Sequence, residues 1–123
     1  DFERENGKIE KGSIVLIHTG WDKYWDNPEK YLNNFLFPSV LPEAAELLIE
    51  RDISGLGIDT ITPDRHGDGF PVHKILLGNG KFIIENITNL NKLPATGSYC
   101  FALPIKSQDG AEAPIRMIGL RLE

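Results

Sequence analysis

A histidine and two carboxylates that border apolar segments have the clearest potential for chemistry. His73 and Glu85 stand twelve residues apart, with a predicted short helix, a glycine turn and an apolar strand between them. Asp59 and Glu85 each follow an apolar strand directly. Because ligands of open α/β sheets bind at the carboxyl ends of strands, this path brings His73 and Glu85 to one sheet edge. A neutral imidazole and a carboxylate are suitable ligands for zinc or manganese.

Each of these residues also has an ordinary structural interpretation. His73 could be a helix-end histidine satisfied by backbone groups, and Glu85 could cap a turn or form a salt bridge. Asp59 could cap the turn that contains Thr60 and Thr62, which is the commoner role for an aspartate at such a place. Its other interpretation is a residue that supports the metal ligands. The spacing alone therefore leaves a metal site and a structural role open.

Other candidate residues carry a weaker signal. His18 ends an apolar strand, where a structural histidine is common, and His66 lies in a loop rich in glycine and aspartate. Trp21 and Trp25 have the default role of core residues. The sequence contains no G-x-S-x-G elbow, no P-loop and no G-x-G-x-x-G motif. The usual templates of nucleophilic catalysis and nucleotide binding are therefore missing.

The elements that must position these residues alternate between strands and helices. Apolar and β-branched runs predict strands at residues 13–18, 54–58, 82–84, 98–104 and 114–122. Helical spacing and turn signals predict a helix that begins near Pro28, capped by Asn27, a second over 43–52 that Pro42 opens, and a third over 70–77. The last two strands are predicted to pair antiparallel. The order indicates an α/β layered domain, with glycines in the second strand where another part packs closely.

The bulk composition restricts the partners and the compartment. A length of 123 residues with 41% hydrophobic content fits one domain with a real core. The net charge of −5 and the scattered lysines argue against nucleic acid and anionic membranes as partners. No apolar run approaches the roughly 20 residues that span a bilayer. The single cysteine, Cys100, lies in an apolar strand and fits a reducing compartment, so a cytoplasmic location is predicted.

The segment 24–40 is rich in aromatic residues for a polar connector. It contains Tyr24, Trp25, Tyr31, Phe35 and Phe37. Aromatic side chains are enriched in the cores of protein interfaces, so this segment predicts a homo-oligomer. The alternative is that Tyr31 and Phe35, four residues apart, pack inward as one helix face.

Several short motifs occur in the order typical of one known family. They cover residues 16–21, 57–60, 70–77, 84–90, 93–94, 103–106 and 114–116. From about Gly12 onward the chain resembles the metal-dependent cyclases, kynurenine formamidases and isatin hydrolases. The resemblance implies an α/β fold of the swivelling β/β/α type with a mixed sheet. It also implies a divalent metal, zinc or manganese, and hydrolysis of a small amide, lactam or ester.

The same resemblance implies roles for individual residues. His73 and Glu85 fall on metal-ligand positions, Glu85 is also expected to touch the attacking water, and Trp21 is expected near the substrate. A small-molecule substrate and a homodimer or homotetramer are implied as well. The family's main metal motif, His-x-Gly-Thr-His-x-Asp with a further histidine, has no match in this sequence.

We therefore interpret residues 1–123 as the carboxy-terminal part of a single cyclase-like hydrolase domain. The full-length protein is expected to be an arylformamidase-like enzyme acting on C–N bonds, and this chain alone is expected to be inactive. The alternative is a non-catalytic oligomerisation or ligand-binding module of the same fold.

Overall fold

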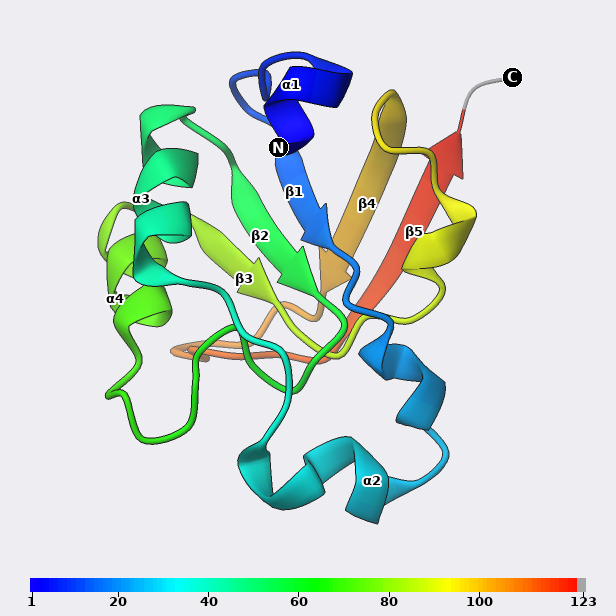
Figure 1. The fold of residues 1–123 in the computed structure, drawn as a ribbon. Coiled ribbons are helices and arrows are strands. Elements are labelled where there is room, and N and C mark those ends of the chain that lie inside the picture. The colour runs from blue at the N-terminus through cyan, green and yellow to red at the C-terminus, as the bar shows by residue number, and fades with distance from the viewer. Residues whose placement is uncertain (122–123) are drawn as a thin grey trace. The chain divides into compact units, whose positions relative to one another are not determined.

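The computed structural model describes residues 1–121, which fall into two compact units (Figure 1). The first unit covers Asp1–Asn91, and the second comprises the described part of Lys92–Glu123. All of the candidate metal ligands lie in the first unit, so its parallel sheet is the scaffold that positions them.

The first unit is built on a three-stranded parallel sheet. Its strands are β1 (Ile14–Ile17), β2 (Gly55–Ile58) and β3 (Phe82–Ile84), in the order β1-β2-β3. All four residues of the central strand β2 are buried, as its continuous apolar run predicted. A Cβ added at Gly57 would lie 2.6 Å from side-chain carbons of both Leu16 and Ile87. The predicted close packing on a glycine of this strand is therefore confirmed.

Two helices pack together against the sheet. They are α3 (Pro42–Glu50) and α4 (Pro71–Gly78). Helix α3 begins at the proline that the sequence indicated, whereas α4 begins one residue later than the predicted start at Phe70. The core between them and the sheet consists of Val40, Ala45, Leu48, Ile53, Leu56, Ile58, Val72 and Leu76. The short helix α1 (Phe2–Asn6) is tied to the end of α3, because Arg51 forms two charged hydrogen bonds of 2.7 and 2.9 Å with Glu3.

Helix α2 (Pro28–Leu32) begins as predicted, with the side chain of Asn27 accepting a hydrogen bond of 3.0 Å from the Lys30 amide. Tyr31 on this helix is buried, whereas Phe35 is 47% exposed. The chain leaves the helix after Leu32 and turns through three residues of positive φ, including Phe35 at 63°. The alternative that Tyr31 and Phe35 pack inward as one helix face is therefore wrong for Phe35.

The second unit is an antiparallel hairpin of β4 (Ser98–Pro104) and β5 (Ile115–Arg121), with Ser98 paired to Arg121. The predicted pair is confirmed, although the strand expected at 114–122 begins one residue later and residue 122 lies outside the described residues. In the described residues the parallel and antiparallel strands form two separate sheets rather than one mixed sheet.

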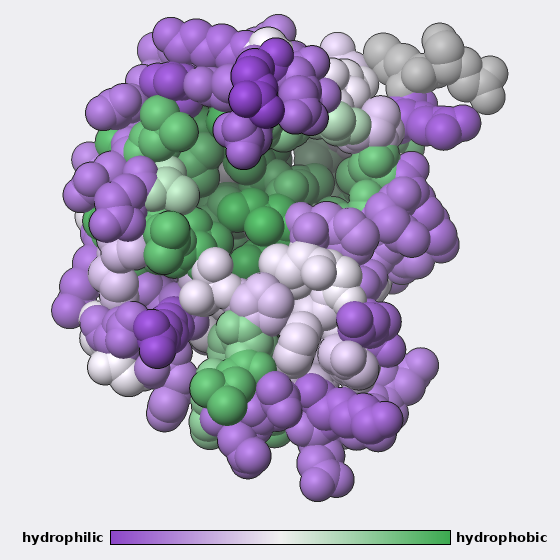
Figure 2. Space-filling view, in the orientation of Figure 1, coloured by the Kyte–Doolittle hydropathy of each residue, from purple (hydrophilic) through white to green (hydrophobic). Residues whose placement is uncertain are grey.

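Apolar side chains gather at the centre of the face shown in Figure 2, over the strands of the parallel sheet. The four residues of β1 are all partly exposed, so the described part of the first unit leaves some of its apolar sheet uncovered. Among the described residues, no helix combines the length and apolar character needed to cross a membrane.

Candidate metal centre

The carboxyl ends of the three parallel strands bring the candidate residues to one edge of the sheet. Ile17 of β1 pairs with Ile58 of β2, so His18 and Asp59 leave the sheet at the same level. Glu85 leaves β3 one strand further along. The sheet edge predicted from the sequence therefore exists, and the contacts of each side chain decide its role.

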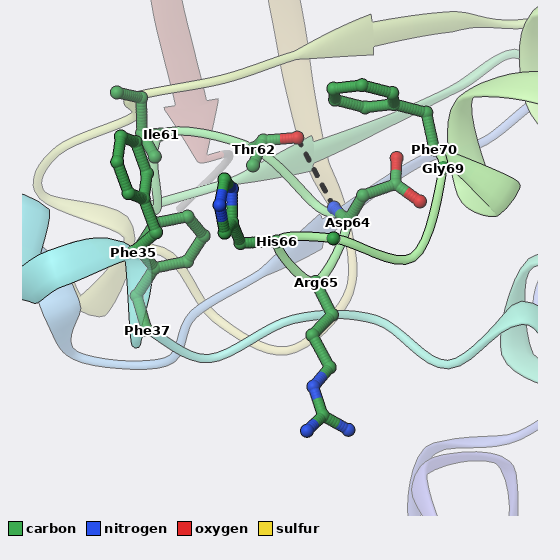
Figure 3. Close-up of a pocket in the computed structure, with 10 residues that line it drawn as sticks. Phe35, Phe37, Ile61, Thr62, Asp64, Arg65, His66, Gly69 and Phe70 are labelled. Carbon is green, nitrogen blue, oxygen red and sulfur yellow. Dashed lines mark hydrogen bonds between the residues drawn. The ribbon is translucent and has the colours of Figure 1, made fainter.

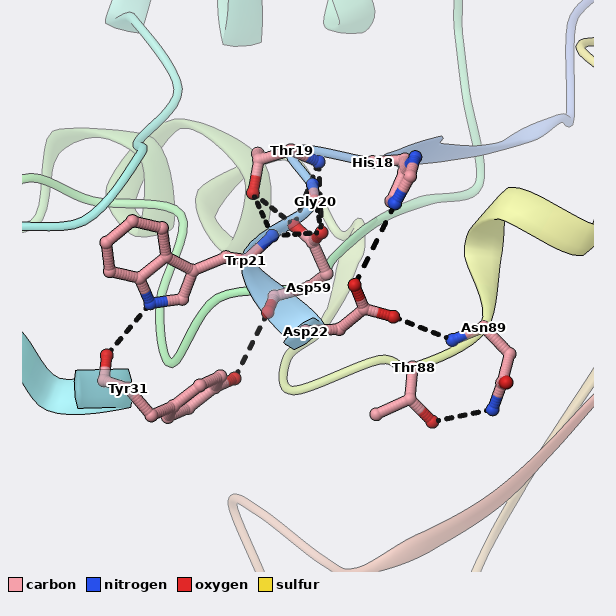
Figure 4. A network of polar contacts seen from close by, with 9 residues as sticks. All are labelled: His18, Thr19, Gly20, Trp21, Asp22, Tyr31, Asp59, Thr88 and Asn89. Carbon is pink, nitrogen blue, oxygen red and sulfur yellow. Dashed lines mark hydrogen bonds and ion pairs between the residues drawn. The ribbon is translucent and has the colours of Figure 1, made fainter. Parts of the chain in front are cut away.

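Asp59 is fully buried, and its carboxylate organises the turn that follows β1 (Figure 4). It accepts hydrogen bonds from the Thr19 amide and hydroxyl, the latter at 2.6 Å, and from the amides of Gly20 and Trp21 at 2.8 and 3.0 Å. The prediction that Asp59 caps a turn with Thr60 and Thr62 is wrong in its partners. Thr60 instead donates to the carbonyl of Thr62, at 2.8 Å.

A first possible metal group lies at this turn. Ligand atoms of His18, Asp22 and Asp59 lie within 4.8 Å of one another. Both oxygens of Asp59 already accept hydrogen bonds from the turn, and Asp22 accepts one of 3.0 Å from the amide of Asn89. A cation bound to Asp59 would compete with those bonds. Because the oxygens of Asp59 are already occupied as hydrogen-bond acceptors, this group is the less favourable metal site.

A second possible metal site pairs His73, on the first turn of α4, with Glu85, directly after β3. His73 Nε2 lies 3.6 Å from Glu85 Oε1, and the side chains are 26% and 31% exposed. Two ligand atoms bound to one tetrahedral zinc at about 2.1 Å lie about 3.4 Å apart. The pair therefore fits a shared divalent metal in its chemistry and its spacing, and its partial exposure leaves an open side for further ligands.

Asp64 is the residue at this site that the sequence analysis missed. Its side chain is 1% exposed, and its Oδ2 lies 2.5 Å from His73 Nδ1. It also accepts hydrogen bonds from the amides of Val72 and His73, at 2.7 and 3.1 Å. One signal in the sequence could have found it: the helix at Pro71 is preceded by Phe70, whose side chain cannot accept a capping hydrogen bond.

The backbone after Glu85 is held in place by a residue of another element. Asn86 has a left-handed φ of 59°, its amide donates to the Thr60 carbonyl at 2.9 Å, and its side chain lies 2.9 Å from the Tyr31 hydroxyl. Burial, followed by the nearby carboxylates, raises the pKa of Tyr31 to about 12, so its hydroxyl keeps its proton at neutral pH.

Trp21 is anchored beside this network rather than placed in the main core. Its indole Nε1 donates to the Tyr31 carbonyl at 2.8 Å, and its ring meets the edge of Tyr24 at a centroid distance of 5.0 Å. The ring also lines a shallow surface hollow with Phe35 and Arg65. Its position combines structural contacts with access to a surface cavity.

An aromatic cavity of about 170 Å³ is lined in part by Asp64, the residue that contacts His73 (Figure 3). Phe35 and His66 stack at one end, with ring centroids 4.5 Å apart, and Phe70 and Asp64 lie at the other. Phe70 also meets the ring of His73 edge-on, at 5.8 Å. The cavity is large enough for about one aromatic ring, and two of its lining residues, Asp64 and Phe70, contact His73.

The fold and the site thus define an α/β protein with a histidine–carboxylate pair at a sheet edge. Comparisons with known proteins identify its relatives. The cyclase family model, described as "Putative cyclase", matches residues 1–65. The chain is 34% identical to the isatin hydrolase of Roseibium aggregatum, over 97% of this chain and 49% of the relative.

Solved structures give the same result. An isatin hydrolase bound to the product analogue thioisatinate matches with a TM-score of 0.91 and 33% identity, over 96% of this chain and 48% of that chain. A structure described as a potential metal-dependent hydrolase with cyclase activity matches with a TM-score of 0.74 and 28% identity, over 94% and 55%.

The chain belongs to the cyclase family, so the resemblance and the α/β fold class inferred from the sequence are confirmed. It spans 49% and 59% of the lengths of two curated relatives, the second from Methanocaldococcus jannaschii.

The hydrogen bonds at Asp59 predict a graded loss of stability. Replacing Asp59 with Asn turns an acceptor oxygen into a donor that faces backbone amides, and should lower the free energy of unfolding by about 3 kcal/mol or more. Thr19→Val removes the hydroxyl, which donates to Asp59 and accepts from the Trp21 amide at 3.2 Å, and should cost about 1 kcal/mol because that amide keeps its bond to Asp59. Urea denaturation of both variants tests this. The control is Asp22→Asn, which alters a hydrogen bond from the Asn89 amide and a 3.9 Å ion pair with His18 at a partly exposed carboxylate. Equal stability of Asp59→Asn and wild type would contradict the structural role of Asp59.

Proposed function

We propose that the protein carrying this chain is a divalent-metal hydrolase of a small amide, lactam or ester, with His73 and Glu85 among its metal ligands. The observation that carries the proposal is the 3.6 Å separation between His73 Nε2 and Glu85 Oε1. Membership of the cyclase family and likeness to proteins named isatin hydrolase support the reaction class, because isatin is a cyclic amide. Arylformamidase-like activity, zinc or manganese as the metal, and a cytoplasmic location are the finer parts of the proposal.

Within this proposal the residues of the chain have distinct tasks. A divalent metal supplies Lewis acidity toward a carbonyl group and a nucleophilic water near neutral pH. His73 and Glu85 would hold it at the sheet edge, and Glu85 would also accept a hydrogen bond from the attacking water. Asp59 supports the edge through the turn after β1 without contacting either ligand in the hydrogen bonds described above.

The number of ligands limits what the chain can do alone. Catalytic zinc sites supply three protein ligands, whereas this pair supplies two. We therefore propose that residues 1–123 form the carboxy-terminal part of one hydrolase domain, that further ligands and the proton-transferring histidine lie outside this chain, and that the chain alone binds metal weakly and is inactive.

Metal content and activity test the pair together. His73→Ala and Glu85→Ala should each lower affinity for zinc or manganese by at least the 10–100-fold seen when supporting residues are lost, and should abolish hydrolysis of isatin or N-formylkynurenine. The measurements are elemental analysis of the purified full-length protein and absorbance assays before and after chelation.

His18→Ala is the matched control, because it removes a histidine from the competing group at the turn after β1. It should keep its metal and its activity. Loss of metal from His18→Ala, with full metal in His73→Ala, would move the site to the His18 group. Metal-free protein that hydrolyses isatin or N-formylkynurenine at the normal rate would contradict the metal-dependent function.

We also propose that Trp21 contacts the substrate, supported by its place on a surface hollow beside the aromatic cavity. Trp21→Phe keeps an aromatic face but loses the bond to the Tyr31 carbonyl, so KM should change little while stability falls by about 1 kcal/mol. Trp21→Ala should raise KM on the order of tenfold, or more, because a planar contact is lost. An unchanged KM in Trp21→Ala, with stability lowered by about 3 kcal/mol or more, would make Trp21 a core residue only.

A homo-oligomer, either a dimer or a tetramer, completes the proposal. Phe35 and Leu36 expose 47% and 71% of their surface on the aromatic segment 24–40, and apolar patches of this kind mark interfaces. The double variant Phe35→Ser with Leu36→Ser should halve the mass measured by light scattering without unfolding the subunit. Leu77→Ser, at a residue of α4 that is 53% exposed, is the control. A wild-type protein that is monomeric at tens of micromolar would contradict the idea.

A further inference from the structure

Asp64 performs the task that a capping residue normally performs at the start of a helix. The first amides of a helix have no partner within it, and a side chain at the preceding position usually accepts from them. Phe70 occupies that position before α4, has a left-handed φ of 60° and makes no capping hydrogen bond. Asp64 accepts from the amides of Val72 and His73 instead, across the loop 65–70. One buried carboxylate therefore fixes the backbone of His73.

The same carboxylate also faces the ring of His73. Asp64 Oδ2 lies 2.5 Å from Nδ1 of that ring, while both of its oxygens accept from backbone amides, which can only donate. A carboxylate that acts as acceptor in these contacts requires Nδ1 to carry a hydrogen. In the neutral imidazole the lone pair is then on Nε2, the atom that lies 3.6 Å from Glu85.

We infer that Asp64 is a positioning residue, which holds His73 in the Nδ1–H tautomer and so keeps the Nε2 lone pair available for a divalent cation shared with Glu85. What Nε2 binds rests on the proposed function, whereas the tautomer rests only on contacts within this chain. Carboxylates behind ligating histidines orient the ring and raise its basicity. The capping bonds add a second constraint, because the backbone and the ring of His73 depend on one acceptor.

The rival explanation is that Asp64 only stabilises the start of α4. Asp64→Asn separates the two roles. The amide oxygen in the place of Oδ1 still accepts from the Val72 amide. The NH₂ group in the place of Oδ2 loses the bond from the His73 amide and donates to Nδ1, which places the hydrogen of the neutral ring on Nε2. An Asp→Asn change behind a catalytic histidine inverts its tautomer and disables it in a protein whose structure stays intact. Asp59→Asn is the matched control, since Asp59 is also a fully buried acceptor of several amides but does not touch His73 in its described hydrogen bonds.

The experiment is ¹⁵N NMR of the His73 ring in the metal-free full-length protein, combined with zinc titration by chelator competition. Wild-type protein and Asp59→Asn should both show Nδ1–H, even though Asp59→Asn is less stable. Asp64→Asn should show Nε2–H and bind zinc on the order of 10–100-fold more weakly. A wild-type ring in the Nε2–H form would overturn the inference without any variant, so a variant that fails to fold does not prevent the test.

Two further outcomes separate this inference from the proposed function. Zinc affinity equal to wild type in Asp64→Asn, despite an inverted tautomer, would overturn the positioning role. If the tautomer inverts as expected but wild-type protein binds neither zinc nor manganese, the control of the ring by Asp64 stands and the proposed hydrolase function fails.

Discussion

The burial of two carboxylates beyond the end of β2 is the constraint on which this region depends. Asp59 and Asp64 are 0% and 1% exposed, and a buried carboxylate needs several hydrogen-bond donors to offset its lost hydration. In both cases the donors are mainly backbone amides of another element or turn. Asp59 gathers the turn after β1, and Asp64 gathers the first turn of α4. Asp59 thereby fixes the backbone that follows β1, and Asp64 fixes the backbone of His73.

The candidate metal pair follows from this arrangement. His73 is held through its amide and its ring by Asp64, while Glu85 is followed by Asn86, whose backbone and side chain bond to Thr60 and Tyr31. Neither candidate ligand lies on a free loop, because a helix start positions one and a strand end positions the other. Sites held by secondary-structure elements and their hydrogen bonds keep ligand atoms at a defined separation.

The fold was largely predictable because its signals are local. The apolar runs located all five strands, and Pro42 and Asn27 with Pro28 marked helix starts. The network around the site was less predictable, since its contacts span the chain. Asp59 bonds to Thr19, 40 residues earlier, so an interpretation based on neighbouring threonines chose the wrong partners. Asp64 was missed although Val72 and His73 lie only eight and nine residues further along the chain, because a capping residue normally stands directly before its helix and Phe70 occupies that place.

Two aromatic residues near the His73–Glu85 pair have strained backbones, and the burial of their side chains does not compensate for that strain. Phe35 and Phe70 both have left-handed backbones, with φ of 63° and 60°, a conformation that costs a bulky residue on the order of 1–3 kcal/mol. Both side chains are also 47% or more exposed, so their burial offsets little of that cost. Glycine or asparagine would satisfy the backbone with less strain. The two rings instead line one cavity, where Phe35 stacks on His66, and Phe70 also meets the ring of His73 edge-on. A binding function at this cavity would account for strained aromatic residues there.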